Sequence, residues 1–328
     1  MKVFILGAGP AGASCAIELC KIGIEIVLVD VSSFPRFTPG ESCHPGIEPL
    51  LIQLGVMEKI ITSNPFRFDG IWINKNGELR KEFFNESENW QGFHFNRELF
   101  DTILLDEAIR LGTKFIPNIK AIDYEVKSNA ITKIKSNLGI FAADFFIDAT
   151  GRKCWSAQRL NIGRKVLSDK IYSWYCRIKT DEIVDQKYEA YYEQNDNYQG
   201  FIAKIGKNEH SITVITKKKN DSDLNNFLEI HFPKGITKTL SKGFETNWSI
   251  INEHPIKNLF FVGDSLFQLD PTSSKGILKS IMSGMMVANI LEGMKEGKMN
   301  DMEVKKVYYD WANGFFELES RELTNLNH

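Results

Sequence analysis

Three glycines near the beginning of the chain have the spacing of a dinucleotide-binding turn. Gly7, Gly9 and Gly12 follow a short apolar stretch, residues 1–6, and precede a helical pattern over residues 13–22. In such a turn the first glycine permits a sharp bend, the second lets the backbone approach a pyrophosphate, and the third allows the helix to pack closely on the strand. The free N–H groups at the start of the helix favour a bound anion. We predict that this turn, which also contains Pro10 and Ala11, binds a pyrophosphate.

A carboxylate ends the next predicted strand, residues 25–30. Asp30 lies about twenty residues after the turn, where a carboxylate accepts hydrogen bonds from a ribose diol. No arginine follows it at once to meet a 2′-phosphate, so the pattern favours FAD or NAD over NADP. The glycine turn by itself does not separate FAD from NAD.

Composition excludes several other classes of protein. The chain has 328 residues, of which 43% are apolar and 25% charged, and its formal net charge is −2. This length predicts two domains or one elaborated α/β domain, and the charge gives no reason to expect nucleic acid or an anionic membrane as a partner. No stretch approaches the roughly 18 apolar residues of a membrane span. The five cysteines form no CxxC pair and no zinc spacing, so we expect no metal site and a reducing, cytoplasmic environment.

Two later strands and one early loop add polar residues. Residues 145–148 have a buried strand pattern that continues through the turn Asp148-Ala149-Thr150-Gly151-Arg152. Residues 259–262 precede Gly263-Asp264, then Asp270-Pro271 and Gly276, and an apolar helical pattern follows at residues 277–291. The loop at residues 33–46 contains Arg36, Glu41, Ser42 and His44. A loop of this composition directly after a dinucleotide motif is a frequent place for function, although it could also be a solvated connector.

The order and character of these stretches resemble the FAD-dependent aromatic hydroxylase superfamily over nearly the whole chain. Pro35-Arg36 with Gly40-Glu41-Ser42, and residues 148–152, look most like one branch of it. That branch holds flavin-dependent tryptophan halogenases, geranylgeranyl reductases and flavoproteins that hydroxylate peptidyl tryptophan. The resemblance implies FAD as the cofactor, but it does not specify the substrate.

The resemblance also implies a fold of the α/β class. We expect a Rossmann-like FAD-binding domain, discontinuous over residues 1–70, 93–165 and 251–328. An antiparallel β-sheet substrate-binding domain, residues 71–92 and 166–250, is inserted into it. Asn76-Gly77 predicts a hairpin turn, and helical patterns cover residues 96–111, 221–232 and 301–324. Residues 119–143 predict a meander.

Roles for individual residues follow from the same resemblance. It places the Asp264 carboxylate on the ribityl chain, Arg97 on the FAD phosphates, and Arg36, Glu41 and Ser42 along the FAD cleft. Asp148, with Gly151 and Arg152, resembles the central motif whose carboxylate organises the cofactor loop. The helix that begins near Gly276 and Ile277 would aim its N–H groups at the isoalloxazine, where they stabilise the negative charge of reduced flavin. Alternatively, Arg97 is a solvated residue of the first helical turn and Asp148 only caps a turn.

Two residues are candidates for a catalytic role. His44 lies in the flavin loop and has an ordinary pKa near neutrality, which suits an acid or base. Lys275 would raise the electron affinity of a neighbouring flavin. Either side chain could instead face solvent. Aromatic residues of the predicted sheet could line a substrate pocket or pack in the core; these are Trp72, Trp174, Tyr175, Tyr191 and Phe201.

Departures from the halogenase pattern affect the predicted reaction. The family's Trp-x-Trp-x-Ile-Pro stretch corresponds best to residues 201–206, which keep only the isoleucine. Its catalytic lysine, which activates hypohalous acid, aligns with Phe68. We therefore predict an FAD-dependent monooxygenase that hydroxylates an electron-rich aromatic substrate through a flavin hydroperoxide. The first candidate substrate is a tryptophan side chain in a peptide or protein.

Several alternatives stay open at the level of sequence. They are an alkene reductase similar to the geranylgeranyl reductases, a halogenase with degenerate motifs, and a non-catalytic flavoprotein partner. The flavin could be reduced directly by NAD(P)H or by a separate flavin reductase. The expected partners are therefore an aromatic small molecule or peptide and one of these reductants.

Overall fold

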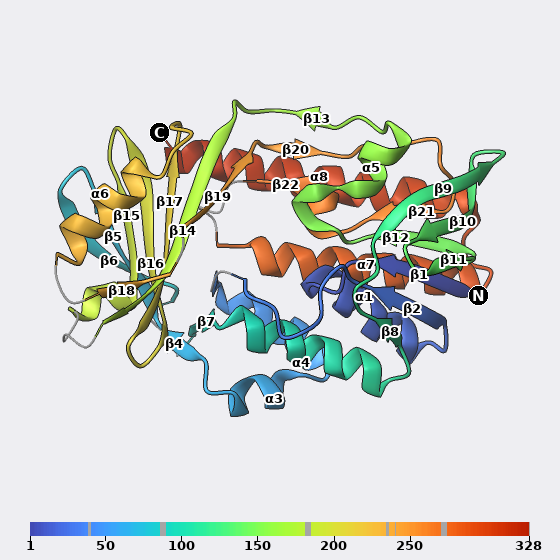
Figure 1. Cartoon of the computed structure of the whole chain (residues 1–328), viewed down its shortest axis with the longest axis horizontal. Helices are drawn as coiled ribbons and strands as arrows, with labels where there is room; N and C mark the ends of the chain where they lie inside the picture. Colours follow the sequence, from blue (N-terminus) through green and yellow to red (C-terminus); the bar gives the residue numbers. More distant parts are fainter. Residues whose placement is uncertain are drawn as a thin grey trace.

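The computed structural model describes residues 1–38, 41–85, 90–180, 185–233, 236–239, 241–269 and 274–327. Figure 1 shows a large β-sheet with one helix on its outer side at one end of the molecule, and a parallel sheet with several long helices at the other end. Three residues of the predicted motifs, Gly40, Asp270 and Pro271, lie outside the described residues.

A parallel five-stranded sheet of order β21-β12-β1-β2-β8 forms the centre of one end. Its strands are β1 (Lys2–Leu6), β2 (Glu25–Val29), β8 (Lys114–Ile116), β12 (Phe145–Asp148) and β21 (Leu259–Phe261). Strands β1 and β12 are mostly apolar and buried, as expected for a sheet that is covered on both faces. The register pairs Leu6 with Val29 and Asp148, and Asp148 with Phe261, so four strands end at the same level.

Three long helices pack together beside this sheet. Helix α1 (Pro10–Lys21) lies against α4 (Arg97–Arg110) and α7 (Gly276–Lys295). Gly284 allows the close contact between α1 and α7, because a Cβ atom there would overlap the carbonyl oxygen of Ala11 and lie 2.6 Å from Ser14 Oγ. Small residues on both helices therefore set how closely the beginning of α1 approaches α7.

A three-stranded antiparallel meander covers one face of the parallel sheet. It consists of β9 (Ala121–Lys127), β10 (Ala130–Ser136) and β11 (Gly139–Phe141), as the sequence predicts. The ring of Phe141 lies 5.2 Å from that of Phe4, and the ring of Tyr124 lies 5.9 Å from that of Phe146. These aromatic contacts join the meander to β1 and β12.

The C-terminal helix α8 (Asp301–Asn327) covers the edge strand β21. Lys305 Nζ donates to the carbonyl oxygens of Ile256 and Leu259 at 2.9 and 3.0 Å, and the Tyr308 hydroxyl donates to the carbonyl oxygen of Phe261. An edge strand needs such partners because its backbone groups lack a neighbouring strand. The same helix continues toward the large sheet (Figure 1).

The large sheet has eight strands, in the order β18-β14-β17-β16-β15-β5-β6 with β19 beside β14. The strands are β5 (Gly70–Lys75), β6 (Glu78–Phe83), β14 (Ile171–Thr180), β15 (Ala190–Gln194), β16 (Tyr198–Gly206), β17 (Glu209–Thr216), β18 (Ile236–Lys238) and β19 (Lys242–Thr246). The predicted hairpin joins this sheet, but β5 runs parallel to β15, so the expectation of a wholly antiparallel sheet is wrong at this pair. These two strands are distant in the sequence, and no tight turn forces them to be antiparallel. The predicted domain boundaries stay a prediction.

Helix α6 (Ser222–His231) packs on the outer face of the large sheet. Ile212, Val214 and Ile202 point toward it, and the ring of Phe227 lies where a side chain on Gly200 would be. Because side chains alternate along a strand, the residues between them face the parallel-sheet end of the molecule. One face of this sheet is thus a core and the other is free to form a cavity wall.

Shorter elements connect these parts. Two three-stranded antiparallel sheets contain β3 (Glu41–Cys43), β7 (Gly92–Phe95) and β4 (Phe66–Phe68), and β13 (Lys165–Val166), β20 (Ser249–Ile250) and β22 (Phe267–Gln268). The remaining helices are α2 (Glu48–Leu54), α3 (Met57–Thr62) and α5 (Trp155–Leu160), and 3-10 turns occur at η1 (Pro45–Ile47), η2 (Gly151–Lys153), η3 (Gln186–Glu189) and η4 (Gly263–Ser265). Within the described ranges, no helix has the length and apolar character required to span a membrane.

The contact between α1 and α7 can be tested with two glycine substitutions. We expect Gly284→Ala to lower the free energy of unfolding by about 1–3 kcal/mol, because the added methyl group forces the two helices apart. Gly314→Ala is the matched control: Gly314 lies inside α8 with no atom near its missing Cβ, so alanine should stabilise the protein by up to about 1 kcal/mol. Urea unfolding measures both values, and equal effects of the two substitutions would contradict the packing argument.

Candidate functional site

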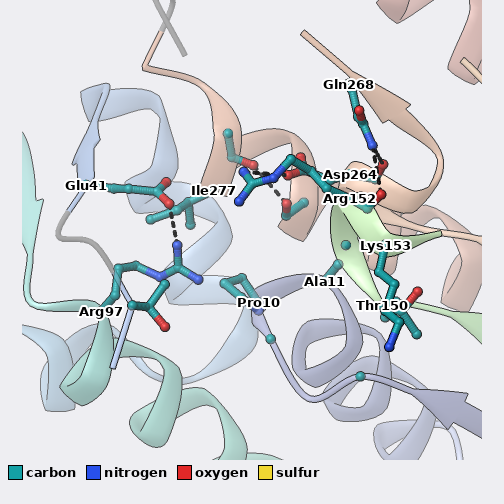
Figure 2. A pocket seen from close by; sticks show the side chains of 18 of the residues that line it. Pro10, Ala11, Glu41, Arg97, Thr150, Arg152, Lys153, Asp264, Gln268 and Ile277 are labelled. Atoms are coloured by element: carbon teal, nitrogen blue, oxygen red, sulfur yellow. Dashed lines mark hydrogen bonds and ion pairs between the residues drawn. The ribbon is translucent and has the colours of Figure 1, made fainter. Parts of the chain in front are cut away.

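A single cavity of about 550 Å³ extends from the carboxyl ends of the parallel strands to the inner face of the large sheet. The residues that follow β1, β2, β12 and β21 all line it: Gly7, Asp30, Ala149 and Val262. Figure 2 shows Arg97 and Glu41 on one side, Arg152 and Asp264 on the other, and Pro10 between them. Ligands of parallel α/β sheets bind at this edge, so the cavity is the candidate site.

The predicted glycine turn forms one wall of the cavity. Helix α1 begins at Pro10 without a hydrogen bond from a capping side chain, so its first N–H groups are available to a ligand. Gly7 has φ of +104°, and a Cβ atom there would overlap the carbonyl oxygen of Ala149. Gly12 does not line the cavity; a Cβ atom there would overlap the carbonyl oxygen of Gly7. Gly12 therefore closes the turn, while Gly9, Pro10 and Ala11 face the ligand space.

Asp30 is buried at the end of β2, beside the turn. Its carboxylate accepts hydrogen bonds from the backbone N–H groups of Ala8 and Ser32 at 2.8 and 2.9 Å. Arg36 Nη1 lies 3.6 Å from the same carboxylate, and Arg36 Nη2 lies 3.9 Å from Asp101. Arg36 Nε is buried and has no hydrogen-bond partner among the described residues. The cavity thus contains an unused donor next to the predicted ribose site.

Arg97 lies at the beginning of α4 with two carboxylates around it. Its Nε donates to Asp101 at 2.7 Å, its Nη2 donates to the same carboxylate at 3.0 Å, and its Nη1 donates to Glu41 at 2.5 Å. Burial lowers the pKa of Arg97, but the charges of Asp101 and Glu41 outweigh this and raise it. Burial raises the pKa of Glu41, and Arg97 opposes that shift. Arg97 is buried rather than solvated, and it fixes Glu41 in the cavity wall.

Asp148 organises the turn after β12 and does not itself line the cavity. Its Oδ1 accepts hydrogen bonds from the backbone N–H and the hydroxyl of Thr150, at 2.8 and 2.6 Å. Its Oδ2 accepts one from the N–H of Ser156 at 2.6 Å. These three bonds hold the backbone of Ala149, Thr150 and Gly151 against the cavity. The structure therefore gives Asp148 a supporting position, in contrast to a direct cofactor contact.

Asp264 follows Gly263 at the end of β21 and faces two cations. Lys279 Nζ lies 3.1 Å from its Oδ1, and Arg152 Nη1 lies 3.9 Å from its Oδ2. Desolvation raises the pKa of Asp264, but Lys279 and Arg152 outweigh it, so the pKa lies below its ordinary value. The carboxylate is ionised at neutral pH and can accept hydrogen bonds from a ligand hydroxyl. Nothing in the sequence pattern identified Lys279, which the helical register of α7 brings beneath Asp264.

Helix α7 brings a second uncapped N-terminus to the cavity. Its first residues, Gly276 and Ile277, line the wall, and no side chain caps their N–H groups. Lys275 precedes them, and its Nζ pairs with Glu319 and Glu322 of α8 at 2.8 and 2.7 Å. Burial lowers the pKa of Lys275, but both glutamates outweigh this and raise it. The catalytic role of Lys275 stays a prediction, and these two carboxylates offset the charge on which that role depends.

The inner face of the large sheet completes the cavity. Its aromatic and small side chains come from four strands: Tyr175 of β14, Phe201 and Ala203 of β16, Ser211 and Thr213 of β17, and Phe244 and Thr246 of β19. Of the predicted aromatic residues, only Tyr175 and Phe201 line the cavity. Trp72, Trp174 and Tyr191 pack on the opposite, α6 side of the sheet. Phe244 was missed because short strands pair only in the tertiary structure, although alternation along residues 242–246 was a usable signal.

His44 lies outside the cavity wall. Its Nδ1 accepts a hydrogen bond from the N–H of Gly46 at 3.1 Å, and its ring lies 5.1 Å from those of Phe84 and Trp90. Burial, followed by the charge of Lys275, lowers the pKa of His44. The acid or base role of His44 stays a prediction that its position does not favour. Glu41 and Ser42, its neighbours in β3, do line the cavity.

The residues present fit FAD in three respects. The uncapped beginning of α1 and the buried Nε of Arg36 suit a pyrophosphate, and Asp30 and Asp264 suit ribose and ribityl hydroxyls. The uncapped beginning of α7 suits the negative charge of a reduced flavin ring. Among the described residues, no group of His, Cys, Asp and Glu could hold a metal ion, and all five cysteines are free.

Comparison with known proteins gives the same cofactor. Residues 1–302 match the family model described as FAD binding domain. The chain is 32% identical over 202 residues to the 1H-pyrrole-2-carbonyl peptidyl-carrier-protein chlorinase of Pseudomonas fluorescens. The aligned region covers 53% of this chain and 45% of that protein. It is 25% identical over 345 residues to the tryptophan 2-halogenase of Chondromyces crocatus. This alignment covers 96% of this chain and 65% of that protein. The chain therefore spans about half to two thirds of the length of these relatives.

A solved structure shows the same fold. The flavin-dependent brominase Bmp2 superposes with a TM-score of 0.84 and 19% identity, over 96% of this chain and 84% of that one. At this level of identity the likeness concerns the arrangement of the sheets and helices.

The position of Asp264 predicts a strong effect on cofactor binding. We expect Asp264→Ala to weaken FAD binding by tenfold or more, roughly the value of hydrogen bonds to a charged group, and to leave Lys279 without its carboxylate. Asp123→Ala is the control, because Asp123 pairs with Arg159 at the surface and does not line the cavity. Flavin absorbance after gel filtration measures retention. Full retention of FAD by the Asp264 variant would contradict its assignment.

Proposed function

Because the chain belongs to the FAD-binding domain family, we propose that it is a flavin-dependent enzyme that oxidises an electron-rich aromatic group bound against the large sheet. The continuity of the cavity carries this proposal. The glycine turn, at Gly9, and the sheet residues Phe201 and Phe244 line the same cavity. A cofactor held at the turn and along Asp264 would end where aromatic side chains face the cavity, and an aromatic substrate packs well there.

The residues of this chain would position the reaction. When bound, FAD supplies the redox chemistry, because its reduced form passes electrons to dioxygen. The beginning of α7 at Gly276 would stabilise negative charge on the flavin ring, and the Asp264 carboxylate would hold the ribityl chain. Phe201 and Phe244 orient the aromatic group and exclude water from that end of the cavity.

Halogenation is the first candidate for the outcome. The relatives named above are a chlorinase of a carrier-protein-bound pyrrole and a tryptophan halogenase. Both names describe an electron-rich aromatic ring as the acceptor. This supports the halogenase alternative more directly than it supports the hydroxylase predicted from sequence.

Hydroxylation is the second candidate, and a specific observation favours it. Phe68, which aligns with the lysine that activates hypohalous acid, is buried with its ring 4.1 Å from that of His94 and does not line the cavity. Among the described residues that the large sheet contributes to the wall, none is a lysine. Four lysines from other elements do line the cavity: Lys120, Lys153, Lys275 and Lys279. Lys275 and Lys279 are paired with carboxylates, and none of the four occupies the position of Phe68. Transfer of an oxygen atom needs no such amine.

One experiment separates these outcomes. The FAD-loaded protein is reduced anaerobically and then mixed with oxygen, chloride or bromide, and a panel of indoles, phenols and pyrroles. Mass spectrometry distinguishes the gain of one oxygen atom from the replacement of hydrogen by halogen, which has its own isotope pattern. We expect one of these two products, and Phe201→Ala should lower its yield because the aromatic group loses its packing surface.

Two controls sharpen the interpretation. Leu79→Ala alters an exposed side chain at the far edge of the same sheet and should leave the yield unchanged. Omission of halide should abolish halogenation and leave hydroxylation intact. Saturation of an alkene without any need for oxygen, or oxidation of the flavin with no modified product from any substrate, would overturn the proposal.

A further inference from the structure

Arg152 places a positive charge in the cavity that is only weakly paired with Asp264. Asp264 already has Lys279 at 3.1 Å, and Lys279 is buried, so this pair is close and well shielded. The guanidinium of Arg152 approaches Asp264 only to 3.9 Å, and none of its N–H groups donates a hydrogen bond within the described part of the chain. Arg152 lines the cavity, and 42% of its side-chain surface is accessible to solvent. Arg152 therefore has donors available to a ligand.

An aromatic ring fixes the orientation of this guanidinium. The Cζ atom of Arg152 lies 3.4 Å from the centroid of the Phe244 ring, which is a close cation–π contact. Such stacking covers one face of the planar group and leaves its N–H groups to point outward along its edge. The carbonyl oxygen of Arg152 accepts a hydrogen bond from Gln268 at 3.4 Å, which restrains the backbone. Figure 2 shows the side chain extending across the cavity from the Asp264 side toward Ile277.

The surroundings of Arg152 suit an aromatic ligand with an anionic group. Phe244, on which the Arg152 guanidinium stacks, belongs to the sheet wall that also contains Tyr175, Phe201 and Thr213. The rings of Tyr175 and Phe244 lie 6.1 Å apart, so the cation is next to an aromatic pair. The positive charge of Arg152 reaches the hydroxyl of Tyr175, since it counteracts the rise in the pKa of Tyr175 that burial causes. A ring held by this wall would place a substituent within reach of the guanidinium.

We propose that Arg152 binds the carboxylate of the aromatic substrate and makes the enzyme select aromatic acids over their neutral analogues. An arginine edge offers two parallel N–H groups to a carboxylate, which gives both strength and orientation. The cation would thus decide which ring positions face the flavin. This inference rests on the function proposed above, because it concerns the substrate end of the same cavity.

Matched pairs of acids and amides test the charge directly. The FAD-loaded protein is titrated with indole-3-acetate and indole-3-acetamide, and with 4-hydroxybenzoate and 4-hydroxybenzamide, while the change in flavin absorbance reports binding. We expect at least one acid to bind roughly tenfold or more tightly than its amide, as a charge-assisted pair predicts. Arg152→Gln should remove this preference, because it weakens binding of the acid and leaves the affinity for the amide unchanged. Arg152→Lys should keep a part of the preference.

Lys153→Gln is the charge-matched control. Lys153 also lines the cavity and is the next residue in the chain, but Figure 2 shows it pointing toward Thr150 and away from the Arg152 guanidinium. The substitution changes the charge of the wall by the same amount and should leave the ratio of acid to amide affinity as in the natural chain. An equal change in this ratio for both variants would show a general field effect and overturn the proposal.

The remaining outcomes are equally decisive. The proposal fails if no acid is preferred over its amide, if neither member of any pair perturbs the flavin, or if Arg152→Gln releases FAD. It also fails if sodium chloride alone gives the same spectral change as the acid and saturates at a similar concentration, because Arg152 would then bind a simple halide. Conversion of neutral aromatic compounds with no preference for acids would refute this inference and leave the proposed function standing.

Discussion

The register of the parallel sheet is the constraint on which the site depends. Leu6, Val29, Asp148 and Phe261 lie side by side at the ends of four strands, so the turns that follow them must meet at one edge. Those turns come from parts of the chain separated by more than two hundred residues. A shift of any one strand would move its turn away from the cavity. The covering of β21 by α8, through Lys305 and Tyr308, protects the strand that is most distant in sequence.

Charged side chains are arranged in opposite ways on the two sides of the cavity. On one side a cation, Arg97, lies between the carboxylates of Asp101 and Glu41. On the other side a carboxylate, Asp264, lies between the cations Lys279 and Arg152. Each central group is ionised because its partners outweigh the cost of burial. A cofactor with both phosphates and hydroxyl groups can therefore find donors and acceptors along a single path between the two uncapped helices.

In the proposed function, the large sheet positions the substrate, away from the turns that follow the parallel strands. A sheet with α6 on one face and the cavity on the other can exchange inward-pointing residues without loss of its core, because alternate side chains belong to separate surfaces. Proteins of this fold can therefore differ in their inward-pointing residues while they keep the same core. In this chain the inner face presents aromatic and hydroxyl groups, and the positive charge beside them comes from Arg152 in the turn after β12. Arg152 therefore joins the turn after β12 to the inner face of the large sheet.

Local sequence determined most of the elements and the motifs that resemble an FAD-binding family. The glycine turn, Asp30, the Asp148 turn and Gly263-Asp264 are defined by residues next to one another, and backbone geometry alone restricts which side chains fit there. Hydrophobic periodicity likewise gave the long helices and the meander to within a few residues. Only the tertiary structure decided that His44 lies outside the cavity wall and that Lys275 is paired with glutamates of α8. It also decided that Asp148 holds the turn after β12 by hydrogen bonds and that Arg152 stacks on Phe244. These are contacts between residues distant in the chain, and their partners are chosen by strand pairing and helix packing, which short-range patterns do not encode.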